Sequence, residues 1–112
     1  MGSKEKRLEA KISDVKSKLS LIGELYPGRI SKQYNICGNP SCRCKDKENP
    51  RKHGPYANLS FTFSGKGRTK FIRKDLVADF MRYTANYKDF RKYSEQLIKY
   101  NIELINLRSE SK

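Results

Sequence analysis

Several features that mark common protein classes are scarce in this chain of 112 residues. No apolar run approaches the roughly 18 residues of a membrane-spanning helix, and the first residues lack the apolar core of a secretory signal. Three cysteines are an odd number, which fits a disulfide framework poorly and reduced thiols well. We therefore expect a cytoplasmic protein that does not enter a membrane.

Acidic side chains are scarce in one part of the chain. Residues 29–74 carry twelve Lys or Arg but only two Asp or Glu, whereas the segments on either side are nearly neutral. A two-metal nuclease needs several clustered carboxylates, and Gly65 and Gly67 indicate a turn rather than a phosphate-binding loop. We therefore expect no enzymatic activity and no small-molecule substrate.

The positive charge of this segment favours a polyanionic partner. A concentrated field attracts nucleic acid, and the release of counterions makes such binding depend strongly on salt. The alternative is a surface that only keeps the protein soluble, but a charge with that role would be spread over the chain. Nucleic acid, DNA or RNA, is therefore the predicted partner.

The segment Cys37–Tyr56 holds all three cysteines and the only histidine. Cys37, Cys42 and Cys44 follow a C-x4-C-x-C pattern, and His53 comes nine residues after the last of them. Thiolates and an imidazole among turn-forming Gly-Pro and Asn-Pro pairs suit tetrahedral zinc. The sequence predicts a structural Zn²⁺ site with these four ligands.

Other interpretations of this segment remain open. The cysteines could be buried thiols, or they could have a redox role based on Cys42 and Cys44 or on Cys37. His53 could instead bond a backbone carbonyl in its turn, and then Asp46 or a residue of a partner would complete the zinc site. The spacing is less specific than paired C-x2-C motifs.

Two long helices are predicted on either side of the basic segment. Apolar residues at alternating steps of four and three predict a first helix over residues 3–27, ended by Pro27-Gly28. A similar stripe predicts a second helix over residues 74–108, with a shorter step between Phe90 and Tyr93. Such narrow stripes need a helical partner, and the unmatched length of the second helix favours a homodimer.

Strand patterns lie between the helices. Arg29–Ile36, Tyr56–Phe63 and Arg68–Arg73 alternate in polarity, and the Gly-rich turn Ser64–Gly67 joins the last two. We expect this hairpin to have one aromatic face and one basic face. The predicted fold is α+β and mostly α: a single domain, residues 1–112, in which an antiparallel coiled-coil hairpin carries a zinc knuckle and β-hairpin head, residues 28–73.

The candidate nucleic-acid contacts are cations of this head. They are Arg43, Lys45, Arg51, Lys52, Lys66, Arg68, Lys70 and Arg73, with Lys32, Lys47 and Lys74 in a wider set. Tyr34 and Tyr56 could stack on single-stranded bases, as could Phe61 and Phe63, although core packing is the favoured role for the two phenylalanines.

The cysteine pattern and the following His53-Gly54-Pro55-Tyr56 resemble a known family over residues 26–105. It comprises small, uncharacterised proteins of archaea and bacteria, a domain of unknown function often found near mobile elements. One departure is Arg73, where that family would have a proline. The resemblance implies a role around DNA in a mobile element, phage or defence system. The alternative is an adaptor or inhibitor whose basic head binds an acidic protein surface.

Overall fold

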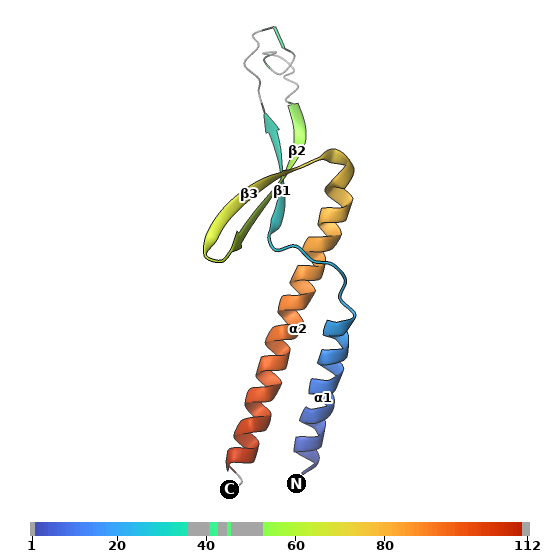
Figure 1. The fold of residues 1–112 in the computed structure, drawn as a ribbon, viewed down its shortest axis with the longest axis vertical. Coiled ribbons are helices and arrows are strands. Elements are labelled where there is room, and N and C mark those ends of the chain that lie inside the picture. Colours follow the sequence, from blue (N-terminus) through green and yellow to red (C-terminus); the bar gives the residue numbers. More distant parts are fainter. Residues whose placement is uncertain (1, 36–40, 43–44, 46–52, 111–112) are drawn as a thin grey trace. The chain divides into compact units, whose positions relative to one another are not determined.

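The computed structural model describes residues 2–35, 41–42, 45 and 53–110 (Figure 1). Within these residues the chain contains two long helices, three strands and a short 3-10 turn, so the predicted α+β, mostly helical class is confirmed. The contacts divide the chain into two compact units. The helical unit comprises Met1–Leu25 and Ala85–Lys112, and the sheet unit comprises Tyr26–Thr84. None of the described helices is long and apolar enough to cross a membrane.

The helical unit is formed by α1, Ser3–Ser20, and by the part of α2, Val77–Glu110, that begins at Ala85. Leu8 and Ile12 of α1 are buried against Leu104 of α2, as the apolar stripes predict. The two helix ends that carry the chain termini lie beside each other (Figure 1). The partly buried residues around this core are Leu97, Tyr100 and Leu107.

The first helix is shorter than its heptad pattern predicts. It ends at Ser20, although the apolar stripe continues to Tyr26. Gly23 disfavours a helix by about 1 kcal/mol relative to alanine. In addition, the Asn86 side-chain amide donates a hydrogen bond of 2.7 Å to the carbonyl oxygen of Glu24. This tertiary contact stabilises a non-helical segment after Ser20, where the apolar stripe predicted that the helix would continue to residue 27.

The second helix starts near its predicted position. Residues Lys74–Leu76 form the 3-10 turn η2, and α2 follows directly. The apolar stripe predicts that Phe90 packs against another helix, but its side chain is 42% exposed. Lys18, close to the end of α1, lies 5.6 Å from the ring of Tyr93. Since α1 ends two residues later, it does not reach Phe90, which is one turn away on α2.

The sheet unit holds a three-stranded antiparallel sheet in the order β1-β2-β3. Its strands are β1, Arg29–Asn35, β2, His53–Phe63, and β3, Lys66–Ile72, close to the predicted segments. Ser64 and Gly65 connect β2 to β3 with φ values of 54° and 77°. Two successive positive φ values define the tight turn that matches the twist of a hairpin.

The core of the sheet unit lies on one face of the sheet. Ala57, Leu59 and Ile72 are buried there, and Leu59 has no exposed surface. The backbone N–H of Tyr26 donates to the carbonyl oxygen of Tyr83 in the first turns of α2 at 3.2 Å. The surrounding, partly buried residues are Tyr26, Ile30, Phe61, Val77 and Phe80.

Candidate nucleic-acid interface

The basic side chains of the β2–β3 hairpin lie on the same face as its apolar residues. Directly paired residues of antiparallel strands project to one face of the sheet. The two-residue turn sets a register that pairs Leu59 with Lys70, Phe61 with Arg68, and Phe63 with Lys66. The prediction of one aromatic face and one basic face is therefore wrong.

Lys70 shows how a cation can share a face with the core. Its ammonium nitrogen lies 5.8 Å from the ring centre of Tyr26 and 5.5 Å from that of Phe80. Tyr26 also makes an edge contact with Phe61, with ring centres 5.2 Å apart. The aliphatic stem of a lysine can cover apolar surface while its charge stays in water, held over aromatic faces.

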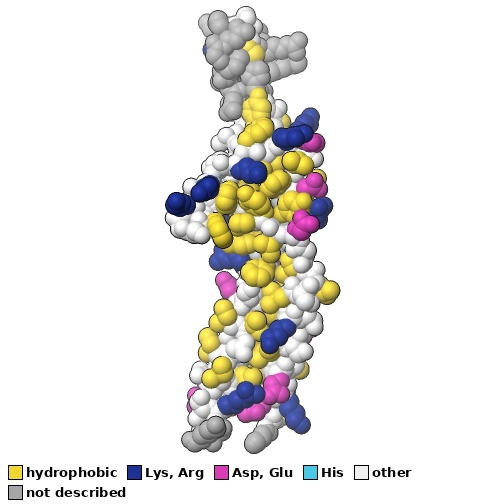
Figure 2. Space-filling view, in the orientation of Figure 1, with side chains coloured by type: hydrophobic (Ala, Val, Ile, Leu, Met, Phe, Trp, Pro, Cys, Tyr) yellow, Lys and Arg dark blue, Asp and Glu magenta, His cyan; other side chains and the backbone are white. Residues whose placement is uncertain are grey.

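Lys66, Arg68 and Lys70 form a row along β3, which we call the basic row. All three are exposed, and alternate residues of a strand are about 7 Å apart. Phe63, opposite Lys66, is 70% exposed rather than packed in the core. Figure 2 shows Lys and Arg side chains beside apolar surface at the hairpin. The row thus offers evenly spaced charges next to an accessible aromatic ring.

No acidic side chain neutralises the basic row within its own sheet. None of the three strands contains Asp or Glu. Two carboxylates of the unit lie in η2 and α2. Asp75 pairs with Arg73 at 3.0 Å, and Asp79 pairs with Arg82 at 3.4 Å. The positive charge of the strand cations is therefore available to attract an anion that approaches the sheet.

The opposite face of the sheet is polar with one aromatic pair. Asn58 donates a hydrogen bond of 2.9 Å to the side chain of Gln33 on the neighbouring strand. Tyr56 and Phe71 lie with their ring centres 6.4 Å apart, and Phe71 is 60% exposed. The Phe71 ring is therefore accessible on this face. Tyr34 of β1 is largely exposed as well.

A cavity of about 550 Å³ opens in the sheet unit where β2 extends past the end of β3. We call it the sheet cavity. Gly54 beside it has a φ of +126°, and a side chain there would place a Cβ 2.6 Å from the carbonyl oxygen of Gln33. Only glycine fits this close approach of β2 to β1. The cavity is lined by Lys32, Gly54, Pro55, Tyr56, Ala57, Phe71, Ile72, Lys74 and Val77.

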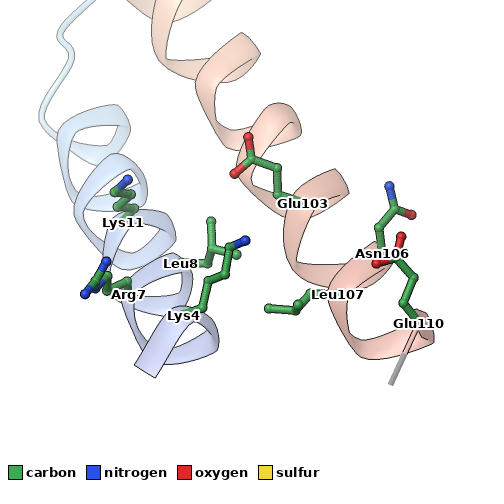
Figure 3. A pocket seen from close by; sticks show the side chains of 8 residues that line it. All are labelled: Lys4, Arg7, Leu8, Lys11, Glu103, Asn106, Leu107 and Glu110. Carbon is green, nitrogen blue, oxygen red and sulfur yellow. The ribbon is translucent and has the colours of Figure 1, made fainter. Parts of the chain in front are cut away.

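A second cavity, of about 400 Å³, lies in the helical unit between α1 and the end of α2 (Figure 3). Figure 3 shows Leu8 and Leu107 between the two helices, with charged side chains around them. Cations from α1 and the carboxylates Glu103 and Glu110 from α2 both line it. Three cations and two carboxylates share this lining, so its charge is mixed, unlike that of the strands of the sheet unit.

Most of the predicted zinc site lies outside the described residues. This applies to Cys37, Cys44 and the alternative ligand Asp46. Cys42 is half-buried, and its carbonyl oxygen accepts a hydrogen bond of 3.0 Å from the Lys45 N–H. The described part of the chain contains no cluster of three metal-ligating side chains. The zinc site stays a prediction.

Five of the eight predicted nucleic-acid contacts are among the described residues, and they do not all lie together. The structure brings together Lys66, Arg68 and Lys70, whereas Arg73 follows β3 and is paired with Asp75. Lys45 is exposed. The remaining three, Arg43, Arg51 and Lys52, lie outside the described residues.

The sequence prediction gave little weight to the charged residues of the sheet cavity. The sequence places Lys32 and Lys74 only in the wider set of candidate cations, and it places Phe71 only in a strand. The two lysines are distant in sequence, so their proximity depends on the strand register and on the position of η2. The available sequence signal for Phe71 is an aromatic residue in a predicted strand, on the face opposite to Arg68 and Lys70.

Comparison with known proteins confirms an uncharacterised domain family and adds no activity. No curated protein and no solved structure matches the chain. A family model described as "Domain of unknown function (DUF6788)" matches residues 5–82. The match includes most of the first helix, whereas the resemblance based on the cysteine and HGPY motifs begins at residue 26. The chain thus belongs to this family of domains of unknown function.

Proposed function

We propose that this protein binds nucleic acid, DNA in the first place, through the sheet unit and without catalysis. The observation that carries the proposal is the charge of the strands. They hold five Lys or Arg and no Asp or Glu. Phosphate contacts from such residues supply most of the sequence-independent affinity for nucleic acid. A role in a mobile element, phage or defence system rests on the resemblance of the motifs.

The basic row is suited to the phosphate backbone. Lys66 and Arg68 have no ion-pair partner among the described residues, so binding a phosphate would break no existing bridge. Exposed Phe63 beside them offers a surface on which an unpaired base can stack. Backbone contacts of this kind position a strand without reading its sequence.

A zinc ion would hold the basic loop at the end of the sheet. The register pairs Asn35, the last residue of β1, with His53, the first of β2. Residues 36–52 therefore connect two neighbouring positions of the sheet. His53 is itself a member of this pair, and Cys37 follows Asn35 by two residues in sequence. We propose Cys37, Cys42, Cys44 and His53 as ligands of a structural Zn²⁺, since thiolate-rich sites seldom activate water.

The long helices would join two copies of the chain in a homodimer with coiled-coil packing. Ile98, Ile102 and Ile105 of α2 lie on one helix face, at steps of four and three residues. Each is more than half exposed. Burying an isoleucine contributes about 1.5–3 kcal/mol, so a second copy that covers this stripe would be stabilised.

A gel-shift assay with purified full-length protein tests the function. We expect binding to short DNA or RNA at about 50 mM salt and a steep loss of affinity towards about 200 mM. No shift with any nucleic acid at low salt would refute the proposal and favour an adaptor for acidic protein surfaces. Elemental analysis of the same sample should find about one zinc per chain. A folded, zinc-free protein would refute the metal site.

A further inference from the structure

The end of the β2–β3 hairpin that carries the turn extends away from the core of the sheet unit. Residues 62–70 are all exposed, whereas the buried residues Ala57, Leu59 and Ile72 lie toward the other end of the two strands. A Cβ added at Gly65, in the turn, would meet no heavy atom within 4 Å. Within the described part of the chain, this tip of the hairpin is therefore open to a partner.

Phe63, at the tip, does not pack in the core. Its side chain is 70% exposed, and it is absent from the group of partly buried aromatic residues that surrounds the core, namely Tyr26, Phe61 and Phe80. Among the described residues, Phe63 makes no contact with another ring and none with a cation over its face. Both faces of this ring are therefore available to a ligand.

The strand register places two cations beside the Phe63 ring, on the same face of the sheet. Lys66 pairs directly with Phe63, and Arg68 pairs with Phe61, two residues away on β2. Side chains in directly opposite positions have Cβ atoms about 4.5–5.5 Å apart, and diagonal neighbours are about 7–8 Å apart, which long side chains can span. Lys66 and Arg68 can therefore both reach a ligand that lies on the Phe63 ring.

These two cations differ from Lys70, the third member of the basic row. The Lys70 ammonium lies over the rings of Tyr26 and Phe80. Lys66 and Arg68 form neither an ion pair nor a cation–π contact with any residue that the structure describes. The charges without a partner in the row are thus the two that flank the exposed ring.

We propose that the tip of the β2–β3 hairpin binds an unpaired nucleotide of a single-stranded nucleic acid, with the base stacked on Phe63 and the neighbouring phosphates on Lys66 and Arg68. The proposal rests on the proposed function and narrows its ligand to single strands. A flat ring between negative charges complements an aromatic face between two cations, whereas an acidic peptide would use the cations alone.

The state of the bases explains why this site would select single strands. In a duplex the bases are paired and stacked on one another, so a ring outside the helix does not reach their faces unless a base is flipped out. Single strands present their bases to aromatic side chains. Phosphates occur in both forms, so Lys66 and Arg68 would contribute to the binding of either, and Phe63 only to the binding of single strands.

A tryptophan at position 63 provides a direct reporter of base stacking. The chain contains no tryptophan, so Phe63→Trp creates a single fluorophore at the tip. A base that stacks on the indole should quench its emission when an oligothymidine single strand is added. The matched control is Phe71→Trp, because Phe71 is 60% exposed and lies on the opposite face of the same sheet. The emission of the control should change much less.

Affinity measurements separate the base contact from the phosphate contacts. We expect Phe63→Ala to weaken single-strand binding about fivefold or more, the effect of one lost base stack. Its affinity for duplex DNA of matched length should change less than twofold, and Phe63→Tyr should keep the single-strand affinity. Lys66→Gln with Arg68→Gln should weaken the binding of both forms. Circular dichroism checks that each variant is folded.

The possible results distinguish the stacking site from the general function. If the wild type binds nucleic acid but Phe63→Ala weakens single-strand and duplex binding equally, or neither, the stacking proposal is wrong and the basic row remains sufficient. An indole at position 63 that responds no more strongly than the one at position 71 would also refute the stacking site. Absence of binding by the wild type to any nucleic acid would refute the proposed function itself.

Discussion

The basic row makes a quantitative prediction about salt. Replacing Lys66 and Arg68 by glutamine removes two exposed cations and leaves Lys70, whose stem packs on the rings of the core. Each phosphate contact contributes about 0.9 to the slope of log affinity against log salt for duplex DNA. The double variant should therefore lower the steepness of this slope by about 1.8. Over a fourfold rise in salt, that is about 12-fold less loss of affinity than in the wild type.

Fluorescence anisotropy with a labelled duplex, measured between about 50 and 200 mM salt, gives the slopes. The control variant carries Lys88→Gln and Lys99→Gln, two exposed cations of the helical unit. It has the same net charge as the test variant, so a general effect of charge would change both slopes equally. Equal slopes for the two double variants, or an unchanged slope in the test variant, would refute the assignment of the basic row.

Three further results are expected. Leu59→Ala should lower the free energy of unfolding by about 2–5 kcal/mol in urea denaturation, because Leu59 is fully buried, whereas Leu21→Ala, at 83% exposure, should change it by less than about 0.5 kcal/mol. Gly54→Ala should lower the melting temperature, because its Cβ would collide with a backbone oxygen of β1; an unchanged melting temperature would contradict that geometry. Ile98→Glu with Ile102→Glu should give a folded monomer in analytical ultracentrifugation, and a persistent dimer would place the interface elsewhere.

The sequence was informative wherever a periodic pattern extended over many residues. The heptad steps around Leu8, Ile12 and Leu104 predicted two packed helices, and these residues are buried as expected. Alternation in β2 and the glycine-containing turn predicted the hairpin. These features depend on local spacing, which a single sequence displays directly.

Features that depend on contacts between distant segments could not be read in this way. The heptad stripe gave no sign that α1 would end at Ser20, because the hydrogen bond between Asn86 and Glu24 joins residues far apart in the chain. The sheet cavity likewise depends on the strand register and on η2, which together bring Lys32 and Lys74 to one site. Neither the tertiary bond nor the cavity has a local sequence pattern.

Photocross-linking of the full-length protein to a labelled single strand, followed by peptide mass spectrometry, tests most directly whether the sheet unit is the nucleic-acid-binding surface. We predict cross-linked residues within β1, β2 and β3, with Phe63 among them. Cross-links confined to α1 and to α2 beyond Ala85, or the absence of any cross-link at low salt, would contradict this assignment.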